Sequence, residues 1–167
     1  MTENLAEVSV VPDGDAWTLI FIRDLRHPPK VVWEALTDPA EIDRWAPFTA
    51  SRDLGHTGDA TLTMVDGAQR DDLPAVVRRA EAPVLLEYSW GDDELRWELE
   101  AYGDGTRLIL KHTVRDRDVA QFAAGWHICI ATMERLLDGD DVRAIRGHEA
   151  MDHGWAELKE AYAEKLE

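Results

Sequence analysis

The stretch GWHICIATMERLL, residues 125–137, brings Trp126, His127 and Cys129 within one turn of an apolar helix. Such a trio is a thiol–imidazole reaction centre, a ligand-contacting face or ordinary core. On a wheel of ~100° per residue, Trp126 lies at the centre of the apolar stripe, Cys129 about 60° to one side and His127 about 100° to the other. Because cysteine and histidine occupy different environments, we expect Cys129 to be inert packing rather than a nucleophile.

Two more polar side chains fall on the apolar faces of predicted strands. In WTLIFIRDL, residues 17–25, the period of two places Arg23 on the same face as Phe21. A buried guanidinium requires a partner, which is either a carboxylate on a neighbouring strand or helix or an anionic group of a ligand. In TRLILKHTV, residues 106–114, the same alternation places His112 beside Leu110 on the inner face. His112 is therefore a core histidine bonded to a neighbour, or a polar contact for a ligand.

Sequence motifs for metals, phosphates and hydrolytic nucleophiles are missing or imperfect. HEAMDH, residues 148–153, resembles a zinc-binding helix, but that motif requires a second histidine where Asp152 stands. The glycines of GDG, residues 103–105, lie between strands and predict a turn rather than a phosphate-binding loop. A G-x-S-x-G pattern is missing as well. We therefore expect no metal, no cofactor and no assignable catalytic residue.

Composition restricts the class of protein and its partners. The chain has 167 residues, 45% of them hydrophobic and 31% charged, which suits one globular domain. Its formal net charge of −16 disfavours nucleic acid and anionic membranes as partners. One cysteine excludes an intramolecular disulfide, and the sequence shows no secretory signal and no membrane-spanning run. We accordingly expect a cytoplasmic protein without membrane insertion.

The elements that position these residues follow in a definite order. The strand at residues 17–25 precedes two short helices, of which the second begins with Asp38 as cap, Pro39 in the first turn and Glu41 completing a capping box. From residue 49 to residue 114, turn residues separate short antiparallel strands. A long amphipathic helix capped by Asp118 follows, and then a tail helix from Trp155. This order predicts an α+β fold, with a curved antiparallel sheet of six or seven strands wrapped around the long helix.

Four segments resemble a known superfamily: IRDLRHPPKVVWEALTDPAEIDRW, VLLEYSWG, WELEAYGDGTRLILKHT and GWHICIATMERLLDG. Their order, from about Trp17 to Gly139, is similar to that of the helix-grip fold of the SRPBCC (START-like) superfamily. The branch that the chain resembles is the one related to the heat-shock-protein activator of the chaperone ATPase. The tail GWAELKEAYAEKL resembles an extension of bacterial members. The resemblance implies a cavity between sheet and long helix that holds apolar small molecules in many relatives.

The predicted organisation is a helix-grip domain over residues 1–140 with a helical extension of the same domain over residues 141–167. Inward-facing residues predict the cavity wall, namely Phe21, Trp97, Leu99, Leu110, Trp126, Ile130 and Met133. Two further aromatic side chains, Trp45 and Trp90, are candidates for the same wall. The alternative for them is that they are ordinary hydrophobic core residues. Arg23, His112 and His127 would orient the polar end of a ligand. His127 and Glu134 share one helix edge about 10 Å apart, too far for a direct hydrogen bond, and would border the mouth.

Three functions compete. The leading hypothesis is non-catalytic binding of a hydrophobic small molecule, such as a lipid or an aromatic metabolite. A second is a co-chaperone-like protein that docks on a chaperone and modulates its ATPase, as the resemblance implies. The third is a cyclase-like or hydrolase-like enzyme acting on an apolar substrate, with Arg23 and His112 working together. Oligomeric state, monomer or homodimer, stays open, as does whether the tail helix docks on its own chain.

Overall fold

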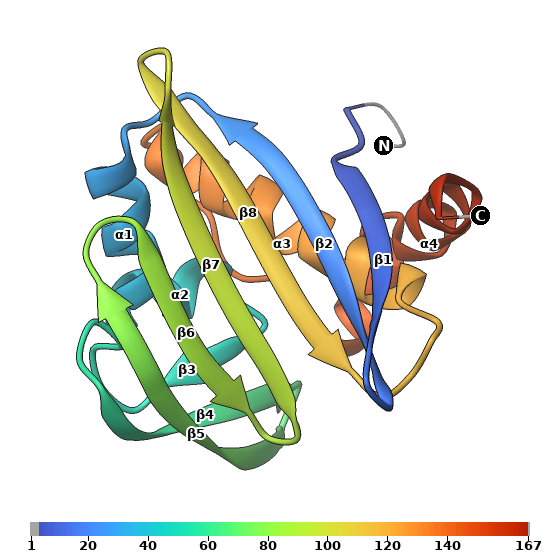
Figure 1. Ribbon diagram of the computed structural model, residues 1–167, viewed down its shortest axis with the longest axis horizontal. Coiled ribbons are helices and arrows are strands. Elements are labelled where there is room, and N and C mark those ends of the chain that lie inside the picture. The colour runs from blue at the N-terminus through green and yellow to red at the C-terminus, as the bar shows by residue number, and fades with distance from the viewer. Residues whose placement is uncertain (1–3, 167) are drawn as a thin grey trace.

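The computed structural model describes residues 4–166 as one curved antiparallel sheet wrapped around a long helix (Figure 1). The sheet has eight strands in the spatial order β1-β2-β8-β7-β6-β5-β4-β3, so β1 and β3 are its open edges. Strand bounds are β1 Glu7–Asp13, β2 Ala16–Leu25, β3 Phe48–Ala50, β4 Gly58–Asp66, β5 Gln69–Glu81, β6 Leu85–Trp90, β7 Asp93–Tyr102 and β8 Gly105–Val114. The predicted α+β helix-grip architecture is confirmed, with one or two strands more than predicted.

The additional strand is β1, which the sequence analysis did not identify. It is an edge strand, most of its residues are exposed, and it contains Pro12, which the interior of a sheet disfavours. It pairs only with β2, through a tight turn at Gly14, where φ is +60°. Because most residues of an edge strand are exposed, its apolar and polar residues alternate only weakly, as they do in EVSVVPD.

The helices are α1 Pro29–Thr37, α2 Pro39–Trp45, α3 Ala120–Leu137 and α4 Trp155–Lys165, with a 3₁₀ helix at Gly147–His153. Asp38 caps α2 as predicted, because its side chain accepts a hydrogen bond from the Ala40 N–H at 3.0 Å. The prediction that Asp118 caps α3 is wrong. Val119 occupies the N-cap without a side-chain bond, and the Gln121 amide instead donates to the Asp118 carbonyl at 3.1 Å.

The inner face of the sheet and the apolar stripe of α3 form the core. Register places Trp97 opposite Leu110, and Leu110 opposite Phe21, so large side chains from three neighbouring strands lie in one row. All three are fully buried. Trp126 and Ile130 of α3 cover this row from the other side and are also buried. The period of two in the strand sequences therefore correctly predicts which of these side chains point into the core.

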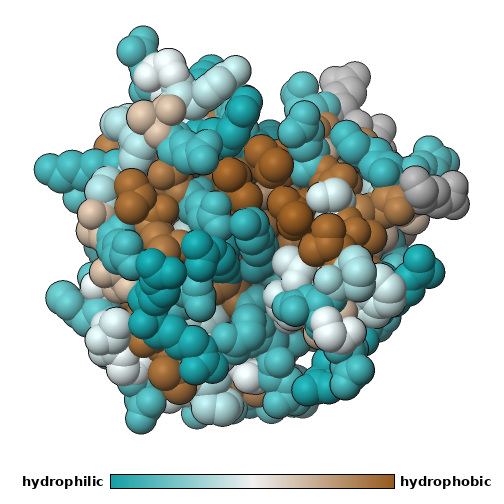
Figure 2. Space-filling view, viewed as in Figure 1, coloured by the Kyte–Doolittle hydropathy of each residue, from teal (hydrophilic) through white to brown (hydrophobic). Residues whose placement is uncertain are grey.

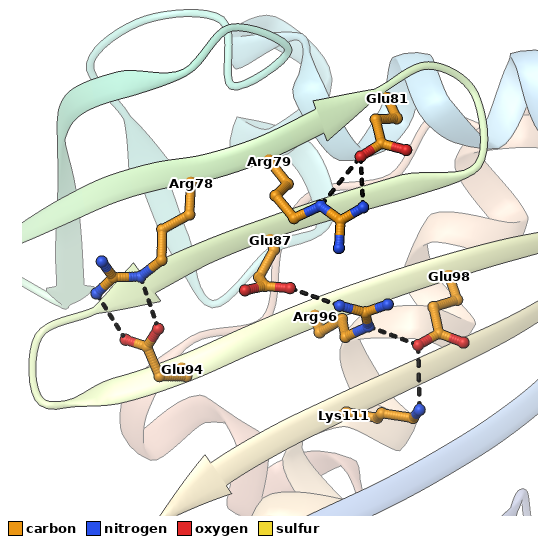
Figure 3. Close-up of polar contacts among 8 residues, drawn as sticks. All are labelled: Arg78, Arg79, Glu81, Glu87, Glu94, Arg96, Glu98 and Lys111. Carbon is orange, nitrogen blue, oxygen red and sulfur yellow. Dashed lines mark hydrogen bonds and ion pairs between the residues drawn. The ribbon is translucent and has the colours of Figure 1, made fainter.

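The outer face of the sheet carries paired charges. Figure 3 shows Arg96 between Glu87 and Glu98, at 2.6 and 2.7 Å, with Lys111 adding a contact to Glu98 at 3.1 Å. Hydrophilic side chains cover most of this face, with hydrophobic side chains visible between them (Figure 2). Opposite charges on adjacent strands stabilise the pairing modestly and leave this face solvated.

The tail helix docks on its own chain, the question that the sequence left open. α4 lies beside α3 at the β1 side of the sheet (Figure 1). Tyr162 of α4 is fully buried, and its hydroxyl contacts His127 Nδ1 at 2.7 Å and accepts from the Ala6 N–H at 2.9 Å. One phenol therefore joins α4, α3 and the segment before β1. Among residues 4–166, no helix combines the length and apolar character needed to cross a membrane.

Candidate functional site

A pocket of about 200 Å³ lies at one end of the interface between the sheet and α3. Trp90 of β6 and His112 of β8 form its sheet side, and α3 contributes Phe122, Trp126 and Cys129. The rest of the wall comes from Pro47, from Met64 of β4 and from the segment 145–155, which we call the C-terminal strap. The lining is mostly apolar and aromatic, with few polar groups. A cavity of this size accommodates one aromatic ring with a small substituent, since an apolar cavity of ~150 Å³ binds benzene.

Three of the predicted site residues meet at this pocket: Trp90, His112 and Trp126. The others lie elsewhere. The indole of Trp97 packs edge-on against the rings of Trp45 at 6.0 Å and Trp126 at 5.3 Å, which closes the middle of the interface. Seven predicted wall residues belong to this packed cluster and do not line the pocket, namely Phe21, Trp45, Trp97, Leu99, Leu110, Ile130 and Met133. The middle of the interface is therefore filled, and the aromatic pocket lies at one end of it.

His112 is held on both sides of its ring. Its Nδ1 accepts a hydrogen bond from the Trp126 indole N–H at 3.0 Å, and its Nε2 lies 2.8 Å from the Asp93 carboxylate. An indole N–H only donates, so Nδ1 carries the lone pair and Nε2 carries the proton that Asp93 accepts. The side chain is 1% exposed. Both ring nitrogens are thus engaged within the protein, as the core alternative of the sequence analysis required.

Arg23 forms an ion pair with a carboxylate on the long helix. Its Nε lies 2.6 Å from Glu134 Oε1, each side chain is 18% exposed, and its Nη1 donates to the Asn4 carbonyl at 3.1 Å. Of the two alternatives for this inward guanidinium, the structure shows the internal carboxylate. Arg23 does not line the aromatic pocket. It lies in an adjacent, more polar groove beside α3, which shares Ile128 and Ile145 with that pocket.

His127 shares that polar groove rather than the aromatic pocket. Burial, reinforced by the positive charge of Arg23, lowers the pKa of His127 to about 4. The imidazole is therefore neutral at pH 7, and its Nδ1 is hydrogen-bonded to the Tyr162 hydroxyl. Its position joins α3 to α4 and does not orient a group inside the pocket.

Cys129 lines the pocket but lacks the features of a nucleophile. It is 5% exposed, and burial raises the pKa of its thiol to about 12. A thiol with such a pKa is almost entirely protonated at neutral pH, and thiolate is the reactive form. The prediction of an inert packing residue agrees with this geometry. The sequence did not predict that Cys129 borders a pocket.

The C-terminal strap forms one wall of the pocket, and sequence reasoning did not find it. Arg146 donates from Nε to the Ala46 carbonyl at 2.9 Å and from Nη2 to the carbonyls of Asp43 and Phe48 at 3.0 and 3.2 Å. Asp43 and Ala46 lie at the C-terminal end of α2, where unpaired carbonyl oxygens attract a cation. The half-buried Arg146 side chain bonds to residues about one hundred positions away, and such a contact leaves no local signal in the sequence.

The neighbouring Gly147 fixes the strap to β4. Its φ is +61°, and a Cβ at this position would lie 2.2 Å from the carboxylate of Asp66. The Asp66 carboxylate accepts from the His148 N–H at 3.2 Å and lies 2.8 Å from the His148 ring. Only glycine allows the strap backbone to approach Asp66 this closely. Two anchors, on α2 and on β4, thus hold the strap over the pocket.

Residues 4–166 contain no group of three or more histidine, cysteine, aspartate or glutamate side chains arranged to hold a metal ion. HEAMDH forms most of the 3₁₀ helix of the strap, where Glu149 pairs with Arg143. The polar groups that reach the aromatic pocket are an imidazole, an amide, a guanidinium and indoles, and this set suits hydrogen bonding to an organic ligand.

Comparison with known families shows which family this chain belongs to. The profile of the family described as "Activator of Hsp90 ATPase homolog 1-like protein" matches residues 26–138. The chain belongs to this AHSA1-like family. The matched region includes Trp90, His112 and Trp126 and stops before the strap. No curated protein matches the chain significantly.

Solved structures share the AHSA1-like fold with this chain. The crystal structure of CalU16 from Micromonospora echinospora has 23% identity and a TM-score of 0.70, and the alignment covers 96% of each chain. An AHSA1-like protein from Aeromonas hydrophila has 22% identity and a TM-score of 0.59, over 73% of this chain and 92% of that one. DynU16, described as belonging to the dynemicin biosynthetic locus, has 25% identity and a TM-score of 0.67, over 81% of this chain and 52% of that one. These likenesses establish the fold.

Proposed function

We propose that this protein binds a small hydrophobic molecule, without catalysis, in the pocket formed by Trp90, His112, Trp126 and the strap. The observation that carries the proposal is the pocket itself, a half-open space of about 200 Å³ walled largely by aromatic and apolar side chains beside the packed core. Burying apolar ligand surface against such walls is favourable, and close packing leaves few such spaces in an ordinary core. Among the structural relatives, DynU16 is tied by its description to the biosynthesis of a small molecule.

The absence of a free catalytic group near the pocket supports binding over turnover. His112 has no free ring nitrogen to move a proton, because Asp93 and Trp126 occupy both. Arg23, its partner in the enzymatic hypothesis, is paired with Glu134 in a different groove. The thiol of Cys129 is protonated. The enzymatic hypothesis therefore finds no pair of residues that act together on one substrate.

A pocket-filling substitution tests the proposal. Gly125 lies on α3 and lines the pocket, and a Cβ there meets no atom within 4 Å. Gly125→Leu should fill the space while retaining the fold, since replacing a helical glycine removes a cost of about 1 kcal/mol. Ala131→Leu is the matched control, because Ala131 lies on the same helix and faces the polar groove instead.

The measurement has two parts. Mass spectrometry of an organic extract of the purified protein identifies what co-purifies, and a thermal-shift panel of lipids and single-ring aromatics measures binding. We expect at least one apolar compound to raise Tm in the native protein and in Ala131→Leu, with Gly125→Leu losing at least tenfold in affinity. A panel in which no apolar compound raises Tm refutes the proposal, as does equal binding by Gly125→Leu.

Chaperone docking is the second candidate, and membership of a family named for an Hsp90 ATPase activator favours it. The net charge of −16 would attract a basic surface on such a partner. A pull-down with the host's own chaperone, followed by an ATPase assay, decides this candidate. Binding at micromolar concentration with a change in ATP turnover supports it, and no binding at that concentration eliminates it.

A further inference from the structure

The polar groove beside α3 is lined by basic side chains. Its volume is about 370 Å³. The ionisable side chains of its lining are Arg23 of β2, His127 and Arg135 of α3, and His153 of the 3₁₀ helix. Within residues 4–166, the lining includes no aspartate and no glutamate. The chain carries 34 acidic residues against 18 lysines and arginines, so this lining is opposite in character to the protein as a whole. Such a composition suits an anionic ligand.

Arg23 brings an uncommitted nitrogen to this groove. Its Nε pairs with Glu134 at 2.6 Å, and its Nη1 donates to the Asn4 carbonyl at 3.1 Å. Its Nη2 has no hydrogen-bond partner among residues 4–166. Over the same residues, the Trp90 indole nitrogen is the one unpaired side-chain nitrogen or oxygen that is shielded from solvent, so Nη2 of Arg23 is open to solvent. An anion can therefore accept from Nη2 without displacing either existing contact.

His127 presents a second donor. The Tyr162 hydroxyl accepts from the Ala6 N–H, and its own proton has Nδ1 of His127 as acceptor, 2.7 Å away. The imidazole is neutral, because its pKa is lowered to about 4, so its one proton is on Nε2. Nε2 has no partner among the described residues and is not a shielded atom, so this N–H is also open to solvent. The charge of Arg23 contributes to the low pKa, which shows that a positive potential reaches the groove.

Carboxylates outside the lining engage only part of the remaining basic groups. Arg135 contacts Asp140 through Nε at 3.2 Å, and its two Nη atoms have no hydrogen-bond partner within residues 4–166. His153 Nε2 lies 3.7 Å from Glu149, which is too long for a hydrogen bond. These carboxylates and Glu134 reduce the net positive charge of the groove. We therefore expect a free small anion to bind there weakly, in the millimolar range.

We propose that the polar groove binds an anionic oxygen group, a carboxylate or a phosphate, through Arg23, His127 and Arg135. The groove shares Ile128 and Ile145 with the aromatic pocket. The anionic group is therefore either the acidic end of the molecule that occupies that pocket or a separate small anion, and both offer the same chemistry to the groove. The proposal does not depend on the aromatic pocket being occupied, because a free anion tests the groove by itself.

Histidine resonances of the native protein test the proposal. Long-range ¹H–¹⁵N correlation follows His127 in the groove and His112 in the aromatic pocket in one spectrum. Inorganic phosphate, acetate and 4-phenylbutyrate are each titrated, with sodium chloride at equal ionic strength as the control. We expect at least one of the three anions, but not sodium chloride, to move the His127 signals to saturation.

The same titration distinguishes the two sources of the anionic group. Movement of His127 alone by phosphate or acetate, with no tighter binding of 4-phenylbutyrate, identifies a separate small anion. Movement of both His127 and His112 by 4-phenylbutyrate, with tighter binding than acetate, identifies the acidic end of the pocket's own ligand. Failure of all three anions to move His127 overturns the proposal. The proposed function would still stand, because its own test is the panel of apolar compounds.

A pair of variants separates a local site from the effect of net charge. Arg135→Gln removes a basic group of the groove, and it should retain the fold because the side chain is 64% exposed. Arg79→Gln is the matched control, since Arg79 is also half exposed and paired with one carboxylate, Glu81, but lies on the outer face of the sheet (Figure 3). We expect Arg135→Gln to weaken binding of the anion about three- to fivefold and Arg79→Gln to leave it unchanged. Equal weakening in both variants would mean that the anion responds only to net charge, and would overturn the proposal.

Discussion

The indole N–H of Trp126 donates to Nδ1 of His112 at 3.0 Å, across the interface between α3 and β8. This bond assigns the histidine a single tautomer, with its proton on Nε2 facing Asp93. A hydrogen bond inside the apolar wall therefore joins α3 to β8. Leaving either of its two groups unpaired there would be costly.

That contact predicts the tautomer of His112 and the cost of losing its partner. Long-range ¹H–¹⁵N correlation at pH 7.5 should show His112 protonated on Nε2 alone. Trp126→Phe leaves Nδ1 unpaired and removes ring volume, so we expect the free energy of unfolding to fall by about 2–4 kcal/mol in urea denaturation. A proton on Nδ1 in the native protein would contradict the assignment.

The strap predicts that access to Cys129 depends on Arg146. Cys129 is the one cysteine of the chain, so alkylation by iodoacetamide at pH 8.5 reports on this thiol alone. Arg146→Met removes three hydrogen bonds of a charged group, and we expect labelling to accelerate at least tenfold because the strap opens more often. Arg143→Met, which breaks a surface contact with Glu149 on the same strap, should leave the rate nearly unchanged. Equal rates in the native protein and Arg146→Met would show that Arg146 does not control access.

His127 predicts a dependence of stability on acid. Its folded pKa of about 4 is below the ordinary value of 6.5, so between these values the unfolded chain binds a proton that the folded protein does not. The stabilising contribution is complete above pH 6.5 and is lost as the pH falls toward 4. His127→Asn keeps an acceptor for Tyr162 and does not titrate, so its Tm should fall by several degrees less than that of the native protein between pH 7 and pH 4.5. Parallel Tm curves for the two proteins would exclude this role.

The Arg23–Glu134 pair predicts a measurable coupling energy. Both side chains are mostly buried, so removing one partner leaves a poorly solvated charge. Each of Arg23→Met and Glu134→Gln should lower the free energy of unfolding by about 2–3 kcal/mol, and a double-mutant cycle should give a coupling of about 1–2 kcal/mol. Arg78 and Glu94 on the outer face (Figure 3) provide the control, because both are about half exposed and their coupling should stay below ~0.5 kcal/mol. Equal coupling in the two pairs would mean that burial adds nothing at Arg23.

Periodicity alone identified which side chains point inward. The period of two placed Trp97, Leu110 and His112 on one face, and the helical period placed Trp126 in the buried stripe, as the structure shows. These assignments depend only on backbone geometry, which repeats over a few residues and is therefore legible in the sequence. The order of helices and strands predicted the fold class for the same reason. The edge strand β1 was not predicted, because its hydrophobic pattern is weak.

Tertiary structure decided where space remains and which charges meet. The partner of Arg23 lies 111 residues away, and Arg146 reaches carbonyls about one hundred residues away, distances over which sequence pattern has no reach. Whether inward-facing rings leave a cavity depends on how they interlock. Trp97 filled the centre of the interface, whereas Trp90 and Trp126 were left bordering a pocket. The sequence determined which side chains make up the interior. Only packing in three dimensions determined where the pocket lies, because the space left between side chains depends on all of them together.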